Sequence, residues 1–377
     1  MHIFTAHRYR EEEKMRLYKM ELYKLVTKRT FTTGVLAVIG LMFVYFWFVE
    51  VDTEVAVVGG HVYSGHEAVQ INREITEEFE GAITNEKINQ IIETYGLPSN
   101  FEENMPGWRD GNYLNDFVTR YFTNGAWEWG AMPTETYALE ETEFGKAYDA
   151  IGTTPYLAYI TGWRVFVEML QFGLVLGSIL VICGISIIFA DEGQTKMLPL
   201  IFTTEEGRKR DVPAKVYASF TLAILIFIGI VLIDVGLCGM VYGLKGFENI
   251  SGMVLSKHML SPVYRIPFSK YMGILLVLGL QAFLSLCSIT LCVSAHQNSS
   301  FSAVIIAAVC WGFPVLLRMF FGGVMWVIVD SMPVFLIMTE TLSDIYMMWY
   351  IALGINICFS GGCLLKGIVH YKTRQVT

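Results

Sequence analysis

The chain has 377 residues, of which 54% are hydrophobic and 16% are charged, and its mean hydropathy is +0.47. Soluble domains carry about 25% charged residues, so this composition excludes a water-soluble globular enzyme and a disordered chain. The net charge of −8 argues against a nucleic-acid partner, because binding phosphates requires a basic face. The sequence therefore predicts an integral membrane protein that binds no nucleic acid.

The N-terminal region, residues 1–30, is basic and directly precedes the first apolar stretch. Positive charge beside a span marks its cytoplasmic end, so the N-terminus is predicted to be cytoplasmic. The helical periodicity of the region also predicts an interfacial helix with one apolar face. Its basic residues are Arg8, Arg10, Lys14, Arg16, Lys19, Lys24, Lys28 and Arg29, and its predicted apolar face holds Met15, Tyr18, Leu22, Leu25 and Val26.

Six stretches contain the ~20 apolar residues that a helix needs to cross the ~30 Å hydrocarbon layer. The fifth contains Pro314, which a membrane helix tolerates when its neighbours satisfy the freed carbonyl. Six crossings return the short tail, residues 367–377, to the cytoplasm of a multi-pass plasma-membrane protein. The predicted spans are 31–50, 163–190, 215–241, 271–293, 301–320 and 346–366.

Of two basic connecting loops, one agrees with this predicted topology and the other disagrees with it. The loop at 191–214 contains Lys196, Arg208, Lys209 and Arg210, which agrees with a cytoplasmic location. The loop at 242–270 is also basic, although six crossings place it outside. We accept this exception because the first helix usually dominates orientation.

Residues 51–162 are predicted to form an acidic extracellular domain with an α-rich or α+β fold. Between Asp52 and Gly162 there are 19 Asp or Glu and 5 Lys or Arg, a net charge of −14, and ~110 residues can bury a small core. The pattern predicts a helix over 67–95 with a fresh start at Thr84, and a further helix from Thr134. Residues 53–64 are predicted to form a hairpin turning at 59–60, with a helix continuing from the membrane as the alternative.

Ionisable residues inside the spans are few, the main ones being Glu168, Asp234 and Arg318. Each charge within hydrocarbon costs at least ~2.5 kcal/mol, so such residues are usually paired or functional. Asp234 and Arg318 lie near the outer ends of their spans, and we expect them to pair or to line an outer vestibule. The alternative is that each side chain extends separately to the lipid headgroups.

The sequence contains no motif for nucleotide chemistry. A phosphate-binding loop ends in Gly-Lys-Ser or Gly-Lys-Thr, and the single Gly-Lys pair here, at 145–146, is followed by Ala147. The His-Glu-x-x-His zinc helix and the Gly-x-Ser-x-Gly elbow are also absent from the sequence. The chain is therefore predicted to be no enzyme, with no catalytic residue, cofactor or metal site of its own.

The segment 189–210 is predicted to form a small cytoplasmic helix that docks into a partner protein. It combines acidic residues at a helix end, a short apolar stretch and a basic cluster. Together with the Glu-Leu-Tyr-Lys-Leu run at 21–25 and the six spans, it resembles the permease subunits of type-2 ABC exporters. The resemblance covers roughly residues 15–50 and 163–366 and leaves the acidic domain aside.

The resemblance implies that this segment is a coupling helix held in a groove of a separate cytoplasmic ABC ATPase, which supplies the ATP and Mg site. It also implies a second permease subunit, as a homodimer or heterodimer, and contact with membrane lipid. The sequence departs from the family pattern at Pro199, which comes early, and at 203–204, where a later proline often stands. The matching coupling positions are Glu192, Thr195, Leu198, Thr203 and Arg208.

The connection between the fifth and sixth spans contains two apolar runs, 324–329 and 333–338, that are too short to cross a membrane. Asp330 and Pro333 separate them, and re-entrant helices fit this pattern best. Because the family closes its pathway externally with such elements, Asp330 and Pro333 are predicted to belong to an extracellular gate. The alternative is an interfacial loop without a gating role.

These features predict a mainly α-helical permease that couples ATP hydrolysis in a partner chain to export, with antimicrobial peptides, drugs, lipids or ions as candidate cargo. One rival function is a polytopic membrane receptor or scaffold whose extracellular domain binds a ligand. A channel is a further rival. It is disfavoured because the spans contain few polar residues in any regular stripe.

Overall fold

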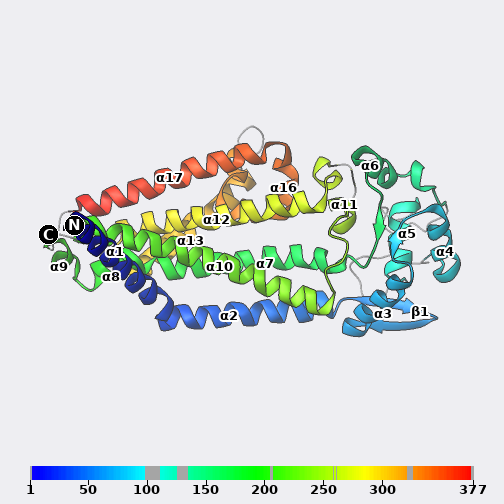
Figure 1. Cartoon of the computed structure of the whole chain (residues 1–377), viewed down its shortest axis with the longest axis horizontal. Coiled ribbons are helices and arrows are strands. Elements are labelled where there is room, and N and C mark those ends of the chain that lie inside the picture. Colours follow the sequence, from blue (N-terminus) through cyan, green and yellow to red (C-terminus); the bar gives the residue numbers. More distant parts are fainter. Residues whose placement is uncertain are drawn as a thin grey trace. The chain divides into compact units, whose positions relative to one another are not determined.

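The computed structural model describes residues 2–97, 111–124, 135–203, 207–257, 259, 261–320 and 326–374. The described chain is mainly helical and divides into two compact units. The helical unit comprises residues 1–40, 171–232 and 275–377, and the mixed unit comprises 41–170 and 233–274. Figure 1 shows the elements of both units.

Among the described residues, six helices are long and apolar enough to cross a membrane, which agrees with the six predicted spans. Each predicted span lies within one of them, and the fifth continues through Pro314. The second and fourth are the inner helices, with 67% and 72% of their apolar windows buried, against 17–22% in the other four. The six are Arg29–Val51, Thr161–Gln194, Lys209–Val241, Phe268–His296, Ser300–Phe320 and Thr339–Thr373.

The helical unit contains the two terminal helices and the short helices that follow the second and fifth spans. In Figure 1, α1, α8, α9 and the C-terminal end of α17 gather at one end of this unit. Its elements, some of which extend beyond it, are α1 (His2–Thr27), α2 (Arg29–Tyr45), α7 (Thr161–Ile185), α8 (Ile187–Gln194), α9 (Leu198–Thr203), η3 (Gly207–Asp211), α10 (Val212–Val241), α12 (Phe268–His296), α13 (Ser300–Phe320), α14 (Trp326–Asp330), α15 (Pro333–Leu336), α16 (Thr339–Ile345), η6 (Tyr346–Met348) and α17 (Trp349–Thr373).

The mixed unit joins short helices to two small antiparallel sheets, with strand order β1-β2 in one and β3-β4 in the other. Parts of α2, α7, α10 and α12 also belong to it. Its own elements are η1 (Phe46–Val51), β1 (Val55–Val58), β2 (His61–Ser64), α3 (Gly65–Glu78), β3 (Gly81–Ala82), α4 (Asn85–Tyr95), α5 (Tyr113–Phe122), η2 (Leu139–Glu141), α6 (Glu143–Ile151), β4 (Tyr156–Leu157), α11 (Ser251–Val254) and η4 (Pro262–Arg265).

The hairpin predicted over residues 53–64 is confirmed, and the alternative of a helix continuing from the membrane is wrong. Strands β1 and β2 pair with Val55 opposite Ser64 and Val58 opposite His61. The turn residues Gly59 and Gly60 have φ values of 60° and 79°. Two consecutive positive φ values suit glycine, because a side chain there meets steric strain, and they match the twist of a two-residue hairpin.

The helix predicted over 67–95 is present in two parts, with the fresh start at Thr84 confirmed. Thr84 caps α4, because its hydroxyl accepts a hydrogen bond from the backbone N–H of Lys87 at 3.3 Å. The helix predicted from Thr134 is wrong, since Thr136 instead forms a β-bridge with Thr123. Helix α6 begins later, where the Thr142 hydroxyl accepts from the Gly145 N–H at 3.0 Å.

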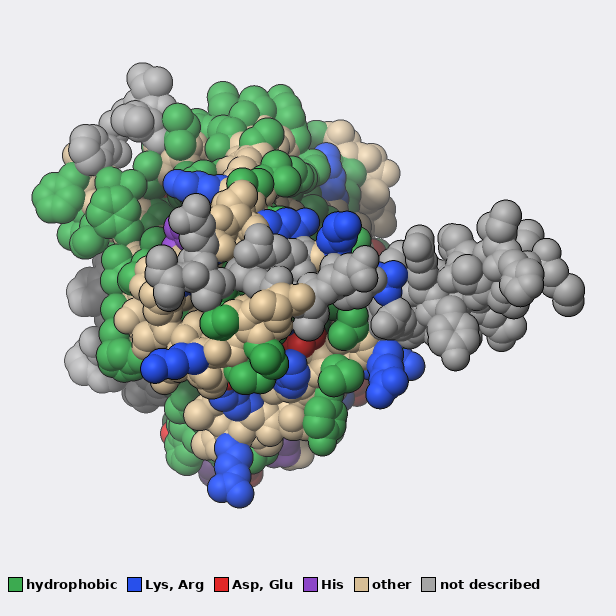
Figure 2. Space-filling model, turned by 90° about the vertical axis from the view of Figure 1, so that its left-hand side faces the viewer, with side chains coloured by type: hydrophobic (Ala, Val, Ile, Leu, Met, Phe, Trp, Pro, Cys, Tyr) green, Lys and Arg blue, Asp and Glu red, His purple; other side chains and the backbone are tan. Residues whose placement is uncertain are grey.

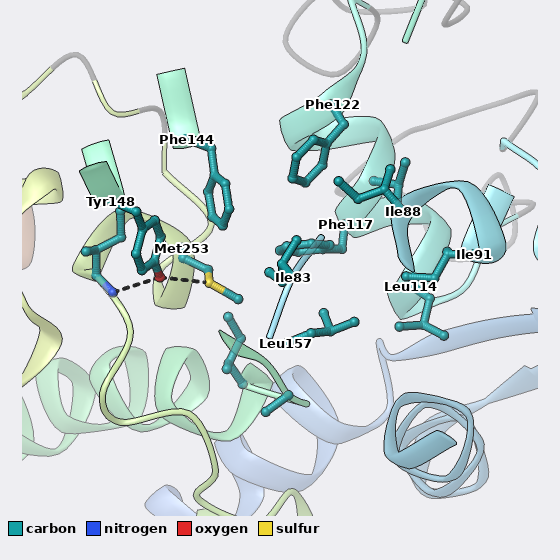
Figure 3. Close-up of a cluster of buried hydrophobic side chains, with 14 of the residues drawn as sticks. Ile83, Ile88, Ile91, Leu114, Phe117, Phe122, Phe144, Tyr148, Leu157 and Met253 are labelled. Carbon is teal, nitrogen blue, oxygen red and sulfur yellow. Dashed lines mark hydrogen bonds between the residues drawn. The ribbon is translucent and has the colours of Figure 1, made fainter. Parts of the chain in front are cut away.

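Aromatic side chains form the centre of the core of the mixed unit (Figure 3). Phe144 is 2% exposed, and its ring centroid lies 5.5 Å from that of Phe122 and 4.9 Å from that of Tyr148. Met253, from the 242–270 segment, packs into the same core, with its sulfur 3.2 Å from the Tyr148 hydroxyl. The acidic domain and the 242–270 segment therefore share one hydrophobic core.

Polar contacts reinforce this shared core. The Tyr148 hydroxyl donates to the side-chain oxygen of Asn249 at 2.8 Å, and the Asn249 amide donates to the Tyr156 carbonyl at 2.9 Å. Lys245 forms ion pairs with Glu77 at 3.2 Å and with Glu80 at 2.8 Å. Lys245 of the basic loop that disagreed with the charge rule thus pairs with two carboxylates of the acidic domain.

We expect Phe144→Ala to destabilise the mixed unit by about 3–5 kcal/mol, because it leaves a cavity beside the packed rings of Phe122 and Tyr148. Denaturant unfolding of the purified chain in detergent, followed by near-ultraviolet circular dichroism, would measure the change. Val62→Ala is the matched control, since the Val62 side chain is 65% exposed. Equal unfolding midpoints for the two variants would contradict the assignment of the core.

Candidate coupling site and buried charges

A buried lysine joins five elements of the helical unit. Lys215 of α10 is 1% exposed, and its Nζ lies 2.6 Å from Asp211 Oδ2, 2.8 Å from Glu192 Oε1 and 3.5 Å from Glu21 Oε1. Glu192 belongs to α8 and Glu21 to α1, and Glu192 also accepts a hydrogen bond from the hydroxyl of Tyr371 in α17. We call these five residues the Lys215 cluster.

The ammonium group of Lys215 is surrounded by three carboxylates. A buried charge must be paired and hydrogen-bonded to be tolerated, so moving one of the four charged members of the Lys215 cluster away would leave the others buried without full compensation. Lys24 adds a second cation, 2.6 Å from Glu21 at the edge of the cluster. The cluster therefore holds the N-terminal helix and the segment after the second span in a fixed relation.

Helix α1 packs against α10 through a face that includes residues of the predicted apolar face and one charged residue that was not predicted to be buried. Leu25 is buried, as expected, and the Tyr18 hydroxyl donates to the Thr221 hydroxyl of α10 at 3.0 Å. Met15 and Val26, also on the predicted apolar face, are exposed, as the lipid-facing side chains of an interfacial helix are. The charged Glu21 is buried because it pairs with Lys215 at 3.5 Å.

The corner between α7 and α8 is fixed by Ser294 of α12. The Ser294 hydroxyl accepts hydrogen bonds from the backbone N–H groups of Phe189 at 3.1 Å and Ala190 at 3.2 Å, and it donates to the Ser186 carbonyl at 2.7 Å. An ion pair of 3.5 Å between Lys28 and Asp191 adds a contact from the start of the first span. Helix α8 is thus anchored from both sides.

The predicted coupling residues have different positions in the structure. Glu192 lies inside the Lys215 cluster, and Leu198 is 5% exposed and anchors α9. Thr195 and Thr203 are exposed and donate to backbone carbonyls of their own segment. Arg208 lies in η3, and its side chain is outside the described residues. Two of the predicted positions therefore support the segment, and the two threonines lie at its surface.

The sequence interpretation missed the two apolar side chains that this segment presents outward. Met197 is 48% exposed and Leu200 is 63% exposed, and we call this pair the α9 tip. Lys196, just before it, has a φ of 57°, which turns the chain sharply between α8 and α9. A short apolar run followed by a basic cluster was the available signal, but it did not show which residues face outward.

Figure 2 shows basic side chains spread over the end of the helical unit that carries α9 and the chain termini. Acidic side chains are sparse in this view. Such a surface attracts anionic lipid headgroups and acidic proteins. The exposed basic residues of the helical unit near its chain termini and short helices are Arg16, Lys19, Lys24, Arg29, Lys196, Lys209, Lys366 and Lys372.

Arg318, at the end of α13, binds two acidic residues of the helical unit. Its Nη2 lies 2.8 Å from Asp344 Oδ2, and its Nε lies 3.4 Å from Asp330 Oδ1. Its guanidinium carbon lies 4.9 Å from the centre of the Phe335 ring in α15. Asp330 is 1% exposed, so this arginine compensates a buried carboxylate.

The breaks between α14, α15 and α16 are stabilised by polar side chains from the spans. Gln171 Oε1 accepts from the backbone N–H of Thr339 at 3.0 Å and from its hydroxyl at 2.7 Å. The Asn356 amide donates to the Ser331 carbonyl at 2.7 Å. Pro333 stands at the first turn of α15, where its missing N–H has no cost. The two predicted apolar runs thus contain short helices, although residues 324–325 lie outside the described residues.

Asp234 has an unusual environment. Its side chain is 0% exposed, and neither carboxylate oxygen has a hydrogen-bond partner among the described residues. The pairing of Asp234 with Arg318 stays a prediction. Glu168, the third predicted charge, is exposed on α7.

The mixed unit contains two neighbouring cavities that share Arg120 and Tyr121. The larger has a volume of about 290 Å³ and is lined by Tyr137, Glu141 and Phe144 among others. The smaller has a volume of about 50 Å³. Its charged lining residues are Glu54, Asp116, Arg120 and Arg164.

Comparisons of the chain with protein-family models, with curated proteins and with solved structures found no match.

We expect Lys215→Met to destabilise the helical unit by about 3–5 kcal/mol, because it leaves three carboxylates without their shared cation. Lys209→Met, which removes an exposed lysine from the same segment, is the control. The midpoint of thermal unfolding of each purified variant in detergent would measure the effect. A Lys215→Met midpoint equal to that of the control would show that the cluster does not hold the fold together.

Proposed function

We propose that the chain is the permease subunit of an ATP-driven exporter of the type-2 ABC kind, and that its partner is a separate cytoplasmic ATPase. The observation that carries the proposal is the α9 tip. Leu200 lies on the six-residue helix α9 and Met197 immediately precedes it, and both exposed side chains belong to a segment that is anchored to the spans. Exposed apolar side chains with a basic surround are typical of a protein-binding surface.

The Lys215 cluster supports a mechanical role for this surface. Helix α9 follows α8, and α8 carries Glu192, which is bonded to α10 through Lys215 and to α17 through Tyr371. A displacement of α9 by a partner is therefore transmitted to two spans and, through Glu21, to α1. We propose that closure of the ATPase moves the spans through this connection.

Charge supports a cytoplasmic location for this end of the helical unit. Helix α1, the 191–214 segment and the end of α17 meet there through Lys28–Asp191, Lys215–Glu21 and Tyr371–Glu192 contacts. Their exposed Lys and Arg residues follow the distribution that positive-inside orientation produces. The acidic domain is then extracellular, and the plasma membrane is the proposed location.

The short helices α14 and α15 support the proposal of a gate between the fifth and sixth spans. Buried apolar side chains from both helices, Val329, Val334 and Phe335, pack together, and Arg318 joins them through Asp330. Helices of this length cannot cross a bilayer, so we propose that they re-enter it from outside. The Arg318–Asp330 pair would then hold the gate closed.

A second candidate function, a membrane receptor, is favoured by one observation. The 290 Å³ cavity in the mixed unit combines aromatic walls with Arg120 and Glu141, which is the kind of lining that binds small ligands. A receptor would use this cavity without requiring an ATPase at α9. The experiment on α9 therefore separates the two functions.

We expect Leu200→Asp to abolish co-purification of the chain with an ABC ATPase encoded beside it, because a carboxylate cannot enter an apolar groove without losing its hydration. Val62→Asp is a closely matched control, since Val62 is 65% exposed and Leu200 is 63% exposed. Co-expression with an affinity tag on the chain, followed by quantification of the bound ATPase, is the measurement.

Reversing the charge of Glu192 would be a poorer test, because Glu192 is committed to Lys215 and Tyr371 and its loss disturbs the fold. Undiminished recovery of the ATPase with Leu200→Asp would remove the α9 tip from the interface. Failure of the unmodified chain to retain any such ATPase would favour the receptor.

A further inference from the structure

The 290 Å³ cavity of the mixed unit is lined by both stretches of chain that share the hydrophobic core. Arg120 and Tyr121 come from α5, and Met259 comes from the 242–270 segment. The rest of the lining lies mainly between Tyr137 and Phe144, in η2 and the start of α6. Pockets for small ligands have volumes of about 300–1,000 Å³, so this cavity has the size to hold one small molecule.

Three aromatic side chains line the cavity, namely Tyr121, Tyr137 and Phe144. The ring centroids of Tyr121 and Phe144 lie 5.0 Å apart, so two helices contribute to one continuous aromatic surface. Phe144 is 2% exposed and belongs to the shared core (Figure 3), whereas Tyr137 is 38% exposed. The aromatic lining therefore extends from the core to the surface, where it offers faces and edges to the ring of a ligand.

Backbone pairing fixes Tyr137 at the cavity. Its N–H donates to the Phe122 carbonyl at 2.8 Å. The preceding residue, Thr136, forms the β-bridge with Thr123. The pairing that replaces the helix expected from Thr134 is thus what brings this aromatic ring to the cavity.

The charged groups of the cavity differ in their burial. Arg120 is 6% exposed, and its Nη1 donates to the Ser256 carbonyl at 3.3 Å. Glu141 and Glu143 are exposed and also line the cavity. The cavity therefore has a positive charge in its buried part and two negative charges at its rim.

The rim is held in place by a capped turn. Thr142 lies between Glu141 and Glu143, and its hydroxyl donates to the Leu139 carbonyl at 2.7 Å and accepts from the Gly145 N–H at 3.0 Å. The two rim carboxylates are therefore carried by a backbone that is already ordered. Ordering the site in advance lowers the cost of binding a ligand.

These charges select among small ligands. A lone cation would be repelled by Arg120, and a lone anion would be repelled by Glu141 and Glu143. A neutral apolar molecule would take water from all three groups without compensating them. A zwitterion with an aromatic body supplies a carboxylate to the guanidinium and an ammonium group to the rim, and its ammonium group is also attracted by the faces of aromatic rings.

We propose that this cavity binds a small aromatic zwitterion, such as an aromatic amino acid or a dipeptide that contains one. The ligand carboxylate lies at Arg120, and the ligand ammonium group lies at Glu141 and Glu143. The aromatic ring of the ligand packs against Tyr121, Tyr137 and Phe144.

This proposal names the ligand class of the cavity on which the receptor alternative rests, and it requires no ATPase at α9. The α9 experiment measures recovery of an ATPase, whereas the experiment below measures binding of a small molecule. Failure of one proposal is therefore distinguishable from failure of the other.

The test is isothermal titration calorimetry of the full chain, purified in detergent, with four probes that share a phenyl ring. Phenylalanine and phenylalanyl-glycine are zwitterions, phenethylamine is a cation and 3-phenylpropionate is an anion. We expect the better zwitterion to bind at least about tenfold more tightly than phenethylamine, which loses the contact with buried Arg120. It should bind about two- to fivefold more tightly than 3-phenylpropionate, which loses only the exposed rim contact.

Variants assign each charge to its end of the cavity. Glu141→Gln should weaken binding of the zwitterions and of phenethylamine by about two- to fivefold and should not weaken binding of 3-phenylpropionate. Glu140→Gln is the matched control, because the Glu140 carboxylate is exposed but accepts from the Asn85 amide at 3.1 Å, and it should leave all four affinities unchanged. Arg120→Gln should remove the preference for the zwitterions over phenethylamine. The Glu141→Gln comparison keeps the test decisive if Arg120→Gln fails to fold.

Three results would overturn the proposal. Absence of binding for every probe at millimolar concentration would show that the cavity is no site for this class of ligand. Equal affinities for the zwitterions and phenethylamine would show that no carboxylate reaches Arg120. Equal losses for all four probes in Glu141→Gln would show a general disturbance of the cavity and no contact with the ammonium group.

Discussion

The arrangement of the helical unit depends on a single buried ammonium group. Lys215 of α10 neutralises carboxylates from α1, α8 and η3, and Tyr371 adds α17 through Glu192. Removing a charge from such a cluster leaves the others buried and uncompensated, so these five elements are retained together or lost together. The position of α9, and with it the proposed contact with an ATPase, follows from this constraint.

The sequence was sufficient to predict whatever depends on local composition. The six spans, the hairpin at 59–60 and the helix start at Thr84 each follow from apolar length or turn chemistry within a few residues. The helix expected from Thr134 failed because Thr136 is bonded to Thr123, a partner outside its local window. Tertiary pairing decided that segment, and local pattern did not reveal it.

The candidate site was predictable only in outline, for the same reason. The acidic and basic residues of the 189–210 segment indicated a docking helix, but their partners lie far away in the sequence. The sequence predicted that Glu192 contacts an ATPase, because nothing in the local pattern shows that it pairs with Lys215. Glu21 stands among apolar residues in the sequence, so its ion pair with Lys215 was not predicted either. Exposure of Met197 and Leu200 likewise depends on which side of α9 packs inward.

The core shared by the acidic domain and the 242–270 segment means that the domain is assembled from two separated stretches of chain. Ile250, Met253 and Met259 complete its interior, and Lys245 balances part of its charge. Cutting out residues 52–160 alone would uncover apolar side chains on both fragments. A soluble version of this domain needs the later stretch joined to the earlier one by a linker.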